Sequence, residues 1–306
     1  MVRSVFGRSP GVLVLSLVTA VAASPQARAA TDAQPDGAIT VSHRARAIQP
    51  GELVVIQAVV AAPATRVTGR AFERSFDLYP AGAPNTWHGL VGIDLDVEPG
   101  TVPVMVQALA PDGSTSRQRH DLVVESKQFP TRRLTVSEEF VNPPANEIER
   151  IQREARQVAT IFGRASGARR WSGPFARPVP GDATSSFGKR SILNGQPRSP
   201  HSGTDFQGAT GTPVQAPNAG RVVLAANLYF SGNVVIVDHG QGLYSYFAHL
   251  SRLGVVEGDE VETGDLLGEV GATGRVTGPH LHWTVRVNGA RVDALSLLSV
   301  LSDETS

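Results

Sequence analysis

The stretch "GPHLHWTV" (Gly278–Val285) places two histidines two positions apart in a run that is typical of a β-strand. Side chains alternate along a strand, so His280 and His282 project from the same face. Trp283 and Val285 point to the opposite face, where core residues are expected. Two exposed strand histidines are the plain interpretation, and a metal or acid–base site is the alternative. The rest of the chain decides between these interpretations.

The composition limits the class of protein. A chain of 306 residues allows about one to three domains. Its 28 basic and 28 acidic residues balance to a formal charge of +0, which gives no support for a nucleic-acid partner. The 31 glycines, 21 prolines and 6% aromatic residues suit a turn-rich β protein. The absence of cysteine excludes disulfides, thiolate zinc sites and cysteine nucleophiles.

The N-terminus has the pattern of a secretory signal peptide. Arg3 and Arg8 precede the apolar run "GVLVLSLVTAVAA" (11–23), and "SPQARAA" follows with Ala27 and Ala29 in small-x-small register. The apolar run is short for a membrane span, which disfavours the alternative of an uncleaved anchor. We therefore expect a signal peptide over residues 1–29, a leader over 30–37, and a soluble exported protein with no stable membrane anchor after cleavage.

Residues 38–127 are predicted to form an Ig-like β-sandwich. Runs rich in β-branched residues recur at short intervals, and turn dipeptides such as Pro50-Gly51 and Asp112-Gly113 separate them. The runs cover residues 52–60, 90–97, 102–109 and 119–126. Short strands punctuated in this way are typical of a sandwich. Its histidines are scattered singly and suggest no chemistry.

Residues 128–184 are predicted to be a linker that contains an amphipathic helix over 146–162. Apolar residues there recur at steps of three and four, from Ile148 to Phe162. Asn146 with Glu149 resembles a capping box, and Gly163 is a typical helix stop. We interpret this helix as a spacer between two domains, followed by a Gly-, Pro- and Arg-rich extended connection.

Strands return over residues 185–306, which we interpret as a second, antiparallel β domain. This part of the chain holds most of the histidines: His201, His239, His249, His280 and His282. We interpret His239, in the turn-like "VDHGQG", as structural. The clustering of the others matters more than any single one of them.

The segment "PHSGTDF" supplies two metal ligands four residues apart, His201 and Asp205. Gly203 and Thr204 disfavour a helix here, so a turn that enters a strand is expected to bring the two side chains together. With one further histidine, zinc would have three protein ligands and an open fourth position, as in catalytic sites. Two neutral histidines and one carboxylate leave a net charge of +1, so the metal still acidifies its water and polarises a carbonyl. The remaining histidines could move protons or hold an oxyanion.

Three segments together resemble the signature blocks of a known family. "HSGTDF", "YSYFAHL" and "GRVTGPHLHW" are similar to those of the zinc-dependent peptidoglycan endopeptidases of the lysostaphin type, the M23 or LytM-domain peptidases. The resemblance runs from about Phe187 to Leu298, and the order and spacing of the three blocks are highly specific. The region upstream resembles, less specifically, the non-catalytic N-terminal part of some exported proteobacterial members.

The resemblance implies a role for each site residue. His201, Asp205 and His282 match the family's zinc ligands. His280 matches the histidine beside the zinc-bound water, a candidate for proton transfer. His249 matches the second non-ligand histidine, which helps to orient the water and to stabilise the tetrahedral oxyanion.

Three other interpretations compete with this one. The segment "GVVEGDEVETGDLLGEV" (254–270) resembles a lipoyl- or biotin-carrier hairpin, but no lysine follows Lys189 to carry the attachment. Some family members that lack metal ligands act as non-hydrolytic activators of cell-wall amidases; here every ligand is present. A metal-storage or sensor module would leave the two non-ligand histidines without a purpose.

The expected function is therefore hydrolysis of peptide cross-links in bacterial peptidoglycan by a zinc metalloendopeptidase. An exported mature chain without a lipid anchor and with this N-terminal region suggests a Gram-negative periplasm. The substrate there would be cross-linked stem peptides cut at the D-alanyl–diaminopimelate bond, and a glycine bridge, as in Gram-positive walls, is the alternative. The expected partners are peptidoglycan stem peptides and, through the N-terminal domain, other cell-envelope proteins. The segment from Arg190 to Arg198, which includes Asn194, is a candidate cover for the groove.

Overall fold

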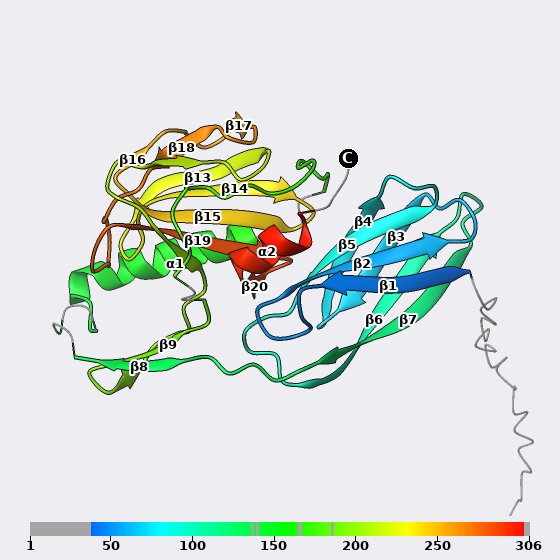
Figure 1. The fold of residues 1–306 in the computed structure, drawn as a ribbon, viewed down its shortest axis with the longest axis horizontal. Helices are drawn as coiled ribbons and strands as arrows, with labels where there is room; N and C mark the ends of the chain where they lie inside the picture. The colour runs from blue at the N-terminus through cyan, green and yellow to red at the C-terminus, as the bar shows by residue number, and fades with distance from the viewer. Residues whose placement is uncertain (1–37, 136–137, 139–140, 165–166, 185–186, 303–306) are drawn as a thin grey trace, which may run out of the picture. The chain divides into compact units, whose positions relative to one another are not determined.

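Figure 1 shows a computed structural model of the chain. It describes residues 38–135, 138, 141–164, 167–184 and 187–302. The predicted signal peptide (1–29) and leader (30–37) lie outside these residues. The described part of the chain is mainly β, as the sequence predicts.

The N-terminal β region consists of seven antiparallel strands, hydrogen-bonded in the order β1-β2-β5-β4-β3-β6-β7. The strands are β1 (Ile39–Ala45), β2 (Leu53–Val60), β3 (Arg66–Ala71), β4 (Arg74–Pro80), β5 (Thr86–Gly92), β6 (Gly100–Leu109) and β7 (Thr115–Val124). Alternate side chains point inward, and aliphatic residues such as Val54, Ile56 and Val104 are buried among them. The period-2 pattern of the sequence therefore builds a core of its own in this region.

The predicted strand over residues 90–97 ends earlier than expected. β5 stops at Gly92, and Asp94 turns away to accept a hydrogen bond from Arg291 Nε at 3.1 Å. The chain then closes a turn, because the Val97 amide donates to the Asp94 carbonyl. The strand thus ends where Asp94 binds Arg291, a residue distant in sequence, and no local sequence pattern predicts this end.

The middle of the chain departs from the predicted linker in two ways. The α-helix α1 (Ile148–Phe162) is preceded by a 3₁₀ turn, η2 (Ala145–Glu147), and the predicted capping box at Asn146 is wrong. The turn itself satisfies the first amides, since the Ile148 amide bonds to the Ala145 carbonyl. Two short strands, β8 (Thr131–Leu134) and β9 (Arg190–Leu193), pair in parallel across this segment, and β10 (Gln196–Pro197) pairs with β9.

The C-terminal β region is built on a sheet with the order β11-β19-β15-β14-β13-β17, with β20 paired to β19. These strands are β11 (Thr204–Gln207), β13 (Gly220–Leu228), β14 (Gly232–Gly240), β15 (Leu243–Leu250), β17 (Glu260–Val261), β19 (His280–Val287) and β20 (Ala290–Val292). A small second sheet orders β12 (Pro213–Gln215), β18 (Leu266–Glu269) and β16 (Arg252–Leu253). The chain then forms the short helix α2 (Ala294–Val300).

The two faces of the large C-terminal sheet have different covers. One face carries Phe247 and Trp283, whose rings stack with centroids 6.0 Å apart, and belongs to the largest buried cluster. The other face carries Tyr244 and Tyr246, against which Phe162 of α1 packs edge-on. The helix therefore covers part of this sheet (Figure 1), and its apolar stripe serves ordinary packing. Its interpretation as a spacer between two domains stays a prediction.

The outer edge of β11 is itself covered. The Thr184 amide donates to the Asp205 carbonyl at 2.9 Å, and the Gln207 amide donates to the Asp182 carbonyl at 3.0 Å. Ala183 also forms an isolated antiparallel bridge with Phe206. This edge strand therefore does not present a free row of backbone donors and acceptors.

The N-terminal β region packs directly on the C-terminal one. Leu53, Val55 and Leu90 belong to the same buried cluster as Trp283 and the other core residues of the C-terminal sheet. Arg291 forms ion pairs with both Asp94 and Asp96 across this contact. The domain boundaries at residues 127 and 184 remain predictions, and residues 34–306 group by their contacts into one unit.

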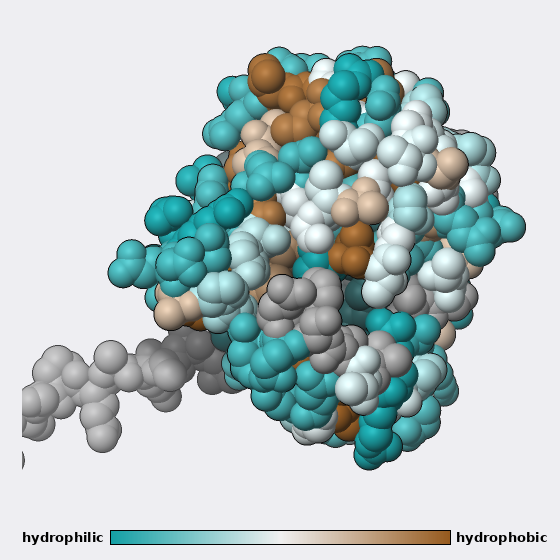
Figure 2. All heavy atoms as spheres, turned by 90° about the vertical axis from the view of Figure 1, so that its left-hand side faces the viewer, coloured by the Kyte–Doolittle hydropathy of each residue, from teal (hydrophilic) through white to brown (hydrophobic). Residues whose placement is uncertain are grey.

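Within the described ranges, no helix is both long and apolar enough to cross a bilayer. Figure 2 shows one face of the molecule, on which apolar residues occur in small groups among hydrophilic ones.

His239 occupies the core of the C-terminal region, as its structural interpretation requires. It is fully buried on β14; its Nδ1–H donates to the Ala219 carbonyl at 2.8 Å, and Ser245 Oγ lies 2.9 Å from Nε2. Burial lowers the pKa of His239 to about 4 from a usual value of 6.5. Since the unfolded chain binds a proton more readily, the stability associated with the neutral ring is present above pH 6.5 and is lost as the pH falls toward about 4.

We predict that the buried imidazole of His239 makes the protein sensitive to acid. Acidification from about pH 7 to about pH 5 should lower the free energy of unfolding by about 2 kcal/mol through this group, since one pKa unit corresponds to about 1.4 kcal/mol. Urea unfolding with chelator present measures this for the wild type and for His239→Asn, which keeps a donor for the Ala219 carbonyl. The variant should be less stable at neutral pH but lose less on acidification. An equal loss in both proteins contradicts the assignment.

Candidate metal centre

The histidine pair that opens β19 lies as strand alternation predicts. Leu281 and Trp283 are fully buried, whereas His280 and His282 are half-buried on the other face. β11 pairs antiparallel with this strand, and its register sets Asp205 directly opposite His282. Two strands far apart in sequence thus bring a carboxylate to the same face as the histidines.

Three side-chain atoms form a tight triangle on this face. His282 Nδ1 lies 2.9 Å from Asp205 Oδ1, and His201 Nε2 lies 3.3 Å from the same oxygen and 3.0 Å from His282 Nδ1. Zinc bonds of about 2.0–2.1 Å in a tetrahedron put neighbouring ligand atoms roughly 3.3 Å apart. The triangle therefore has the size that a tetrahedral metal ion needs, and these three residues form a group that can hold one.

Hydrogen bonds alone do not account for this triangle. Each imidazole nitrogen carries at most one proton, and the carboxylate only accepts. If both nitrogens donate to Asp205, two N–H groups of His201 and His282 face each other at 3.0 Å. A cation among the three atoms uses all three lone pairs at once, so the donor set fits a metal.

Two residues outside the predicted site contact the edge of the His282 ring that faces away from the triangle. Its Nε2 lies 2.9 Å from Thr284 Oγ1, so a proton on Nε2 leaves Nδ1 free to bind a metal. A Cβ on Gly203 would lie 2.5 Å from His282 Nε2, so any larger residue displaces the ring. Alternation along "HLHWT" puts Thr284 on the histidine face and could have identified it; Gly203 carries no such signal.

A backbone irregularity brings His249 to the same face. Ala248 pairs with His282, so regular alternation would turn His249 toward the core. β15 shifts register against β14 at this point, and His249 has a φ of +66°, in the left-handed region. Such a bulge re-aims a side chain. The His249 ring consequently lies 5.2 Å from the His280 ring and 5.8 Å from the His282 ring, between centroids.

The two other histidines are oriented by backbone carbonyls. His249 Nδ1–H donates to the Thr273 carbonyl at 2.9 Å, and His280 Nδ1–H donates to the Gly278 carbonyl at 2.8 Å. A carbonyl only accepts, so Nδ1 of each ring carries a proton and Nε2 faces the triangle. His280 Nε2 lies 3.7 Å from Asp205 Oδ1. The cluster therefore presents two further Nε2 atoms beside the triangle.

The electrostatics of the site favour these charge states. Burial opposes ionisation of Asp205, but its close contacts with His201 and His282 outweigh burial and hold the pKa of the carboxyl well below its usual range. Burial lowers the pKa of His282, against the opposing effect of Asp205. Burial, with the nearby His282, lowers the pKa of His249 to about 4. At neutral pH the site therefore holds one carboxylate, and His249 and His282 are neutral.

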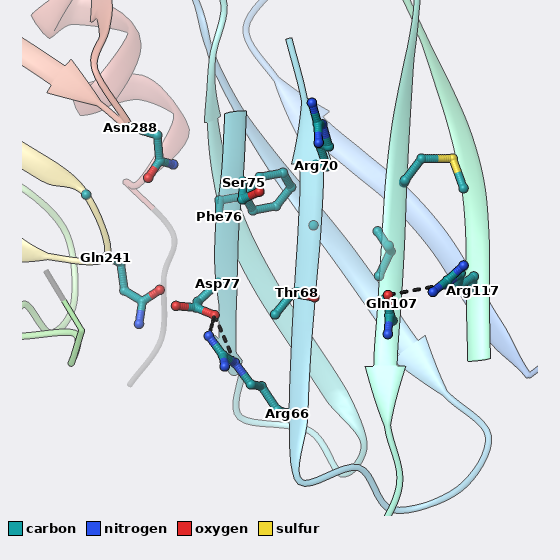
Figure 3. A pocket seen from close by; sticks show the side chains of 14 residues that line it. Arg66, Thr68, Arg70, Ser75, Phe76, Asp77, Gln107, Arg117, Gln241 and Asn288 are labelled. Atoms are coloured by element: carbon teal, nitrogen blue, oxygen red, sulfur yellow. Dashed lines mark hydrogen bonds and ion pairs between the residues drawn. The ribbon is translucent and has the colours of Figure 1, made fainter. Parts of the chain in front are cut away.

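A hollow of about 760 Å³ elsewhere has a different character (Figure 3). Arg66, Arg70 and Arg117 of the N-terminal β region line it, together with Gln241 and Asn288. Among the described residues that line it there is no histidine, and the only carboxylate is that of Asp77, which pairs with Arg66 at 2.8 Å. This hollow is separate from the histidine cluster and is unsuited to a transition metal.

We predict that Asp205→Asn abolishes tight zinc binding, because the amide removes the charge at the shared corner of the triangle. Loss of an outer hydrogen-bond partner alone costs about 10–100-fold in metal affinity, so loss of a ligand should exceed about 100-fold. Competition with a chromophoric chelator measures the affinity. Asp182→Asn, a change at an exposed carboxylate whose side chain lies 3.8 Å from Arg177, is the control. Equal zinc affinity in wild type and Asp205→Asn would show that the metal is held elsewhere.

Comparisons with known proteins agree with this geometry. The profile of Peptidase family M23 matches residues 199–294, which contain all five site residues. Peptidoglycan DD-endopeptidase ShyA of Vibrio cholerae is 44% identical over 96 residues, which cover 31% of this chain and 22% of ShyA. DD-carboxypeptidase/endopeptidase Mpg of Neisseria meningitidis is 40% identical over 97 residues, covering 32% and 22% of the two chains. The match thus spans about a fifth of the length of these curated relatives.

One solved structure resembles nearly the whole described fold. A crystal structure of an M23 peptidase from Pseudomonas aeruginosa is 32% identical, with a TM-score of 0.65, over 83% of this chain and 96% of that one. The likeness therefore includes the region upstream of the histidine cluster. With the profile match at the site itself, it shows that the chain belongs to peptidase family M23.

Proposed function

We propose that the protein is a zinc metalloendopeptidase that hydrolyses peptide cross-links in bacterial peptidoglycan. The observation that carries this proposal is the triangle of His201, Asp205 and His282 with two further imidazole Nε2 atoms, of His249 and His280, beside it. The same three residues are the proposed zinc ligands. The names of the V. cholerae and N. meningitidis relatives support the choice of substrate.

The residues divide between metal binding and proton handling. A zinc ion held by the triangle would polarise an amide carbonyl and acidify water, the chemistry that zinc supplies in hydrolases. His280 Nε2 lies 3.7 Å from Asp205 Oδ1, on the side of the ring away from the Gly278 carbonyl, so it is placed to accept the proton of an attacking water and to pass it to the leaving amine. Strand β19 thus presents a ligand and a base two residues apart.

The geometry refines the expected role of His249. Its Nδ1–H donates to the Thr273 carbonyl, and burial keeps the ring neutral, so Nε2 has a lone pair and no proton. A lone pair can orient water, whereas steadying an oxyanion requires an N–H on that atom. These contacts support the water-orienting role and not the oxyanion role, unless the ring first accepts a proton.

We predict that His249→Ala and His280→Ala keep their zinc and lose most of their turnover. Loss of a general acid or base costs about 10²–10⁴-fold in rate, and neither residue belongs to the triangle. Metal content and cleavage rate are measured on the same samples, with His43→Ala of the N-terminal β region as the control. If either variant contains no zinc, that histidine is a metal ligand and its assignment to proton handling is wrong.

The site chemistry favours an amide over a glycosidic bond as the target. Glycosidases rely on two carboxylates that flank the scissile bond. Among described residues, Asp205 is the only acidic member of the histidine cluster, so an amide is the better target than a glycan. We propose the D-alanyl–diaminopimelate cross-link. The non-hydrolytic activator of amidases is the alternative, and the complete ligand set argues against it.

Digestion of purified sacculi tests the proposal. The protein, with and without chelator, should convert cross-linked muropeptides into monomers whose disaccharides stay intact, as mass spectrometry of the products shows. Cut glycan strands, or stem peptides released from the sugar, would overturn it. No release by the protein alone, combined with stimulation of an added amidase, would favour the activator.

The rest of the chain supports two further parts of this proposal. The strand order β1-β2-β5-β4 beside β3-β6-β7 supports an Ig-like sandwich, because that fold packs strands ABED against CFG. The signal-peptide pattern of residues 1–29 supports export, and we propose a Gram-negative periplasm as the compartment. We also propose other cell-envelope proteins as partners of the sandwich.

A further inference from the structure

Strand β11 connects two environments on its two faces. Asp205 points to the histidine cluster, and the preceding Thr204 is fully buried on the opposite face. There Thr204 Oγ1 donates to Asp293 Oδ1 at 2.8 Å. The position of Asp205 is therefore tied, one residue away, to a carboxylate outside the metal site.

Asp293 has a second partner that comes from the N-terminal β region. Its backbone amide donates to the Gly51 carbonyl, its Oδ1 caps α2 by accepting from the Leu295 amide, and its Oδ2 accepts from Arg46 Nη2 at 3.0 Å. The carboxylate thus has one oxygen on Thr204 and the other on Arg46. A side chain of the N-terminal β region reaches the ligand-bearing strand through two hydrogen bonds.

Arg46 is itself held in place by a buried ion network. Its Nε and Nη2 bind Glu52 at 3.0 and 2.9 Å, and Lys127 Nζ binds Glu52 at 2.8 Å. Glu52 is only 2% exposed. Two cations and two carboxylates therefore balance one another, and the planar guanidinium can bridge both acids at once.

The ligand His201 rests on the same region by a separate route. Its backbone amide and carbonyl bond to the Lys189 carbonyl and the Gly188 amide, so the segment before β9 holds it. Phe187 packs so closely on Gly51 that a Cβ there would lie 2.5 Å from the ring. Both ligand-bearing segments thus lean on the turn at Gly51.

Simple adhesion between the two regions is the plain explanation of these contacts. Arg291 with Asp94 and Asp96, and Asn288 with the Leu90 carbonyl, already provide it, and neither contact touches β11. The Arg46–Asp293–Thr204 chain of side-chain hydrogen bonds, in contrast, ends on the strand that carries the ligand Asp205. We propose that Arg46 is a positioning residue for Asp205, acting through Asp293 and Thr204. This inference rests on the metal site of the proposed function.

A pair of arginine variants in the full chain separates positioning from adhesion. Arg46→Gln should weaken zinc binding about tenfold, the low end of the effect of outer partners on metal affinity, and should also lower the Tm. Arg291→Gln removes a contact between the same two regions and should lower the Tm with less than about a twofold change in zinc affinity. Chelator competition and thermal unfolding give the two readouts.

Variants at Thr204 test the route and do not depend on Arg46→Gln folding. Thr204→Val deletes the hydroxyl at nearly constant shape and should lower the zinc affinity about as much as Arg46→Gln does. Thr204→Ser keeps the hydroxyl and should retain the wild-type zinc affinity. The double variant should be no weaker than either single one, because both break one chain of contacts.

Three results would overturn the proposal. They are wild-type zinc affinity in folded Arg46→Gln or Thr204→Val, an equal loss in Arg291→Gln, and losses that add in the double variant. Because zinc affinity is measured without substrate, a protein that binds zinc as expected but cuts no peptidoglycan disproves the proposed function and leaves this inference standing. A wild type that binds no zinc rejects both.

Discussion

The register between β11 and β19 is the constraint on which the site depends. It sets Asp205 opposite His282 and Gln207 opposite His280. A slip of one residue would turn Asp205 into the core and Thr204 toward the histidines, because side chains alternate. The same register buries Thr204 against Asp293. One antiparallel pairing therefore places a carboxylate among the histidines and anchors its strand from the other side.

The sequence predicts the parts of the site that follow from alternation and from the family blocks. The histidine pair of β19 lies on one face, and His201, Asp205 and His249 join it. His249 reaches this face only through a bulge with a left-handed backbone, and by alternation alone it would point into the core. Its place in the site was expected from the family resemblance, since nothing in the local pattern of "YFAHL" predicts the bulge.

The fold was predictable where elements depend on their own residues, and less so where distant partners decide. β2, β6 and β7 follow from β-branched runs, but β5 ends early because Asp94 turns toward Arg291. The helix α1 was expected from its periodicity, yet its apolar stripe gives no hint of what it covers. It packs on Tyr244 and Tyr246, on the face that also bears the histidines. The metal site thus occupies the part of that face which the helix leaves open.

The covered edge of β11 limits how a peptide can bind beside the histidine cluster. Residues 182–184 already use the backbone groups along this edge, so a ligand cannot extend the sheet as an added strand beside β11. Recognition of a peptide at this edge must then rely on side chains and not on main-chain pairing. Pairing of that kind favours a regular L-polypeptide. A site without main-chain pairing loses nothing when its ligand has mixed chirality or branches.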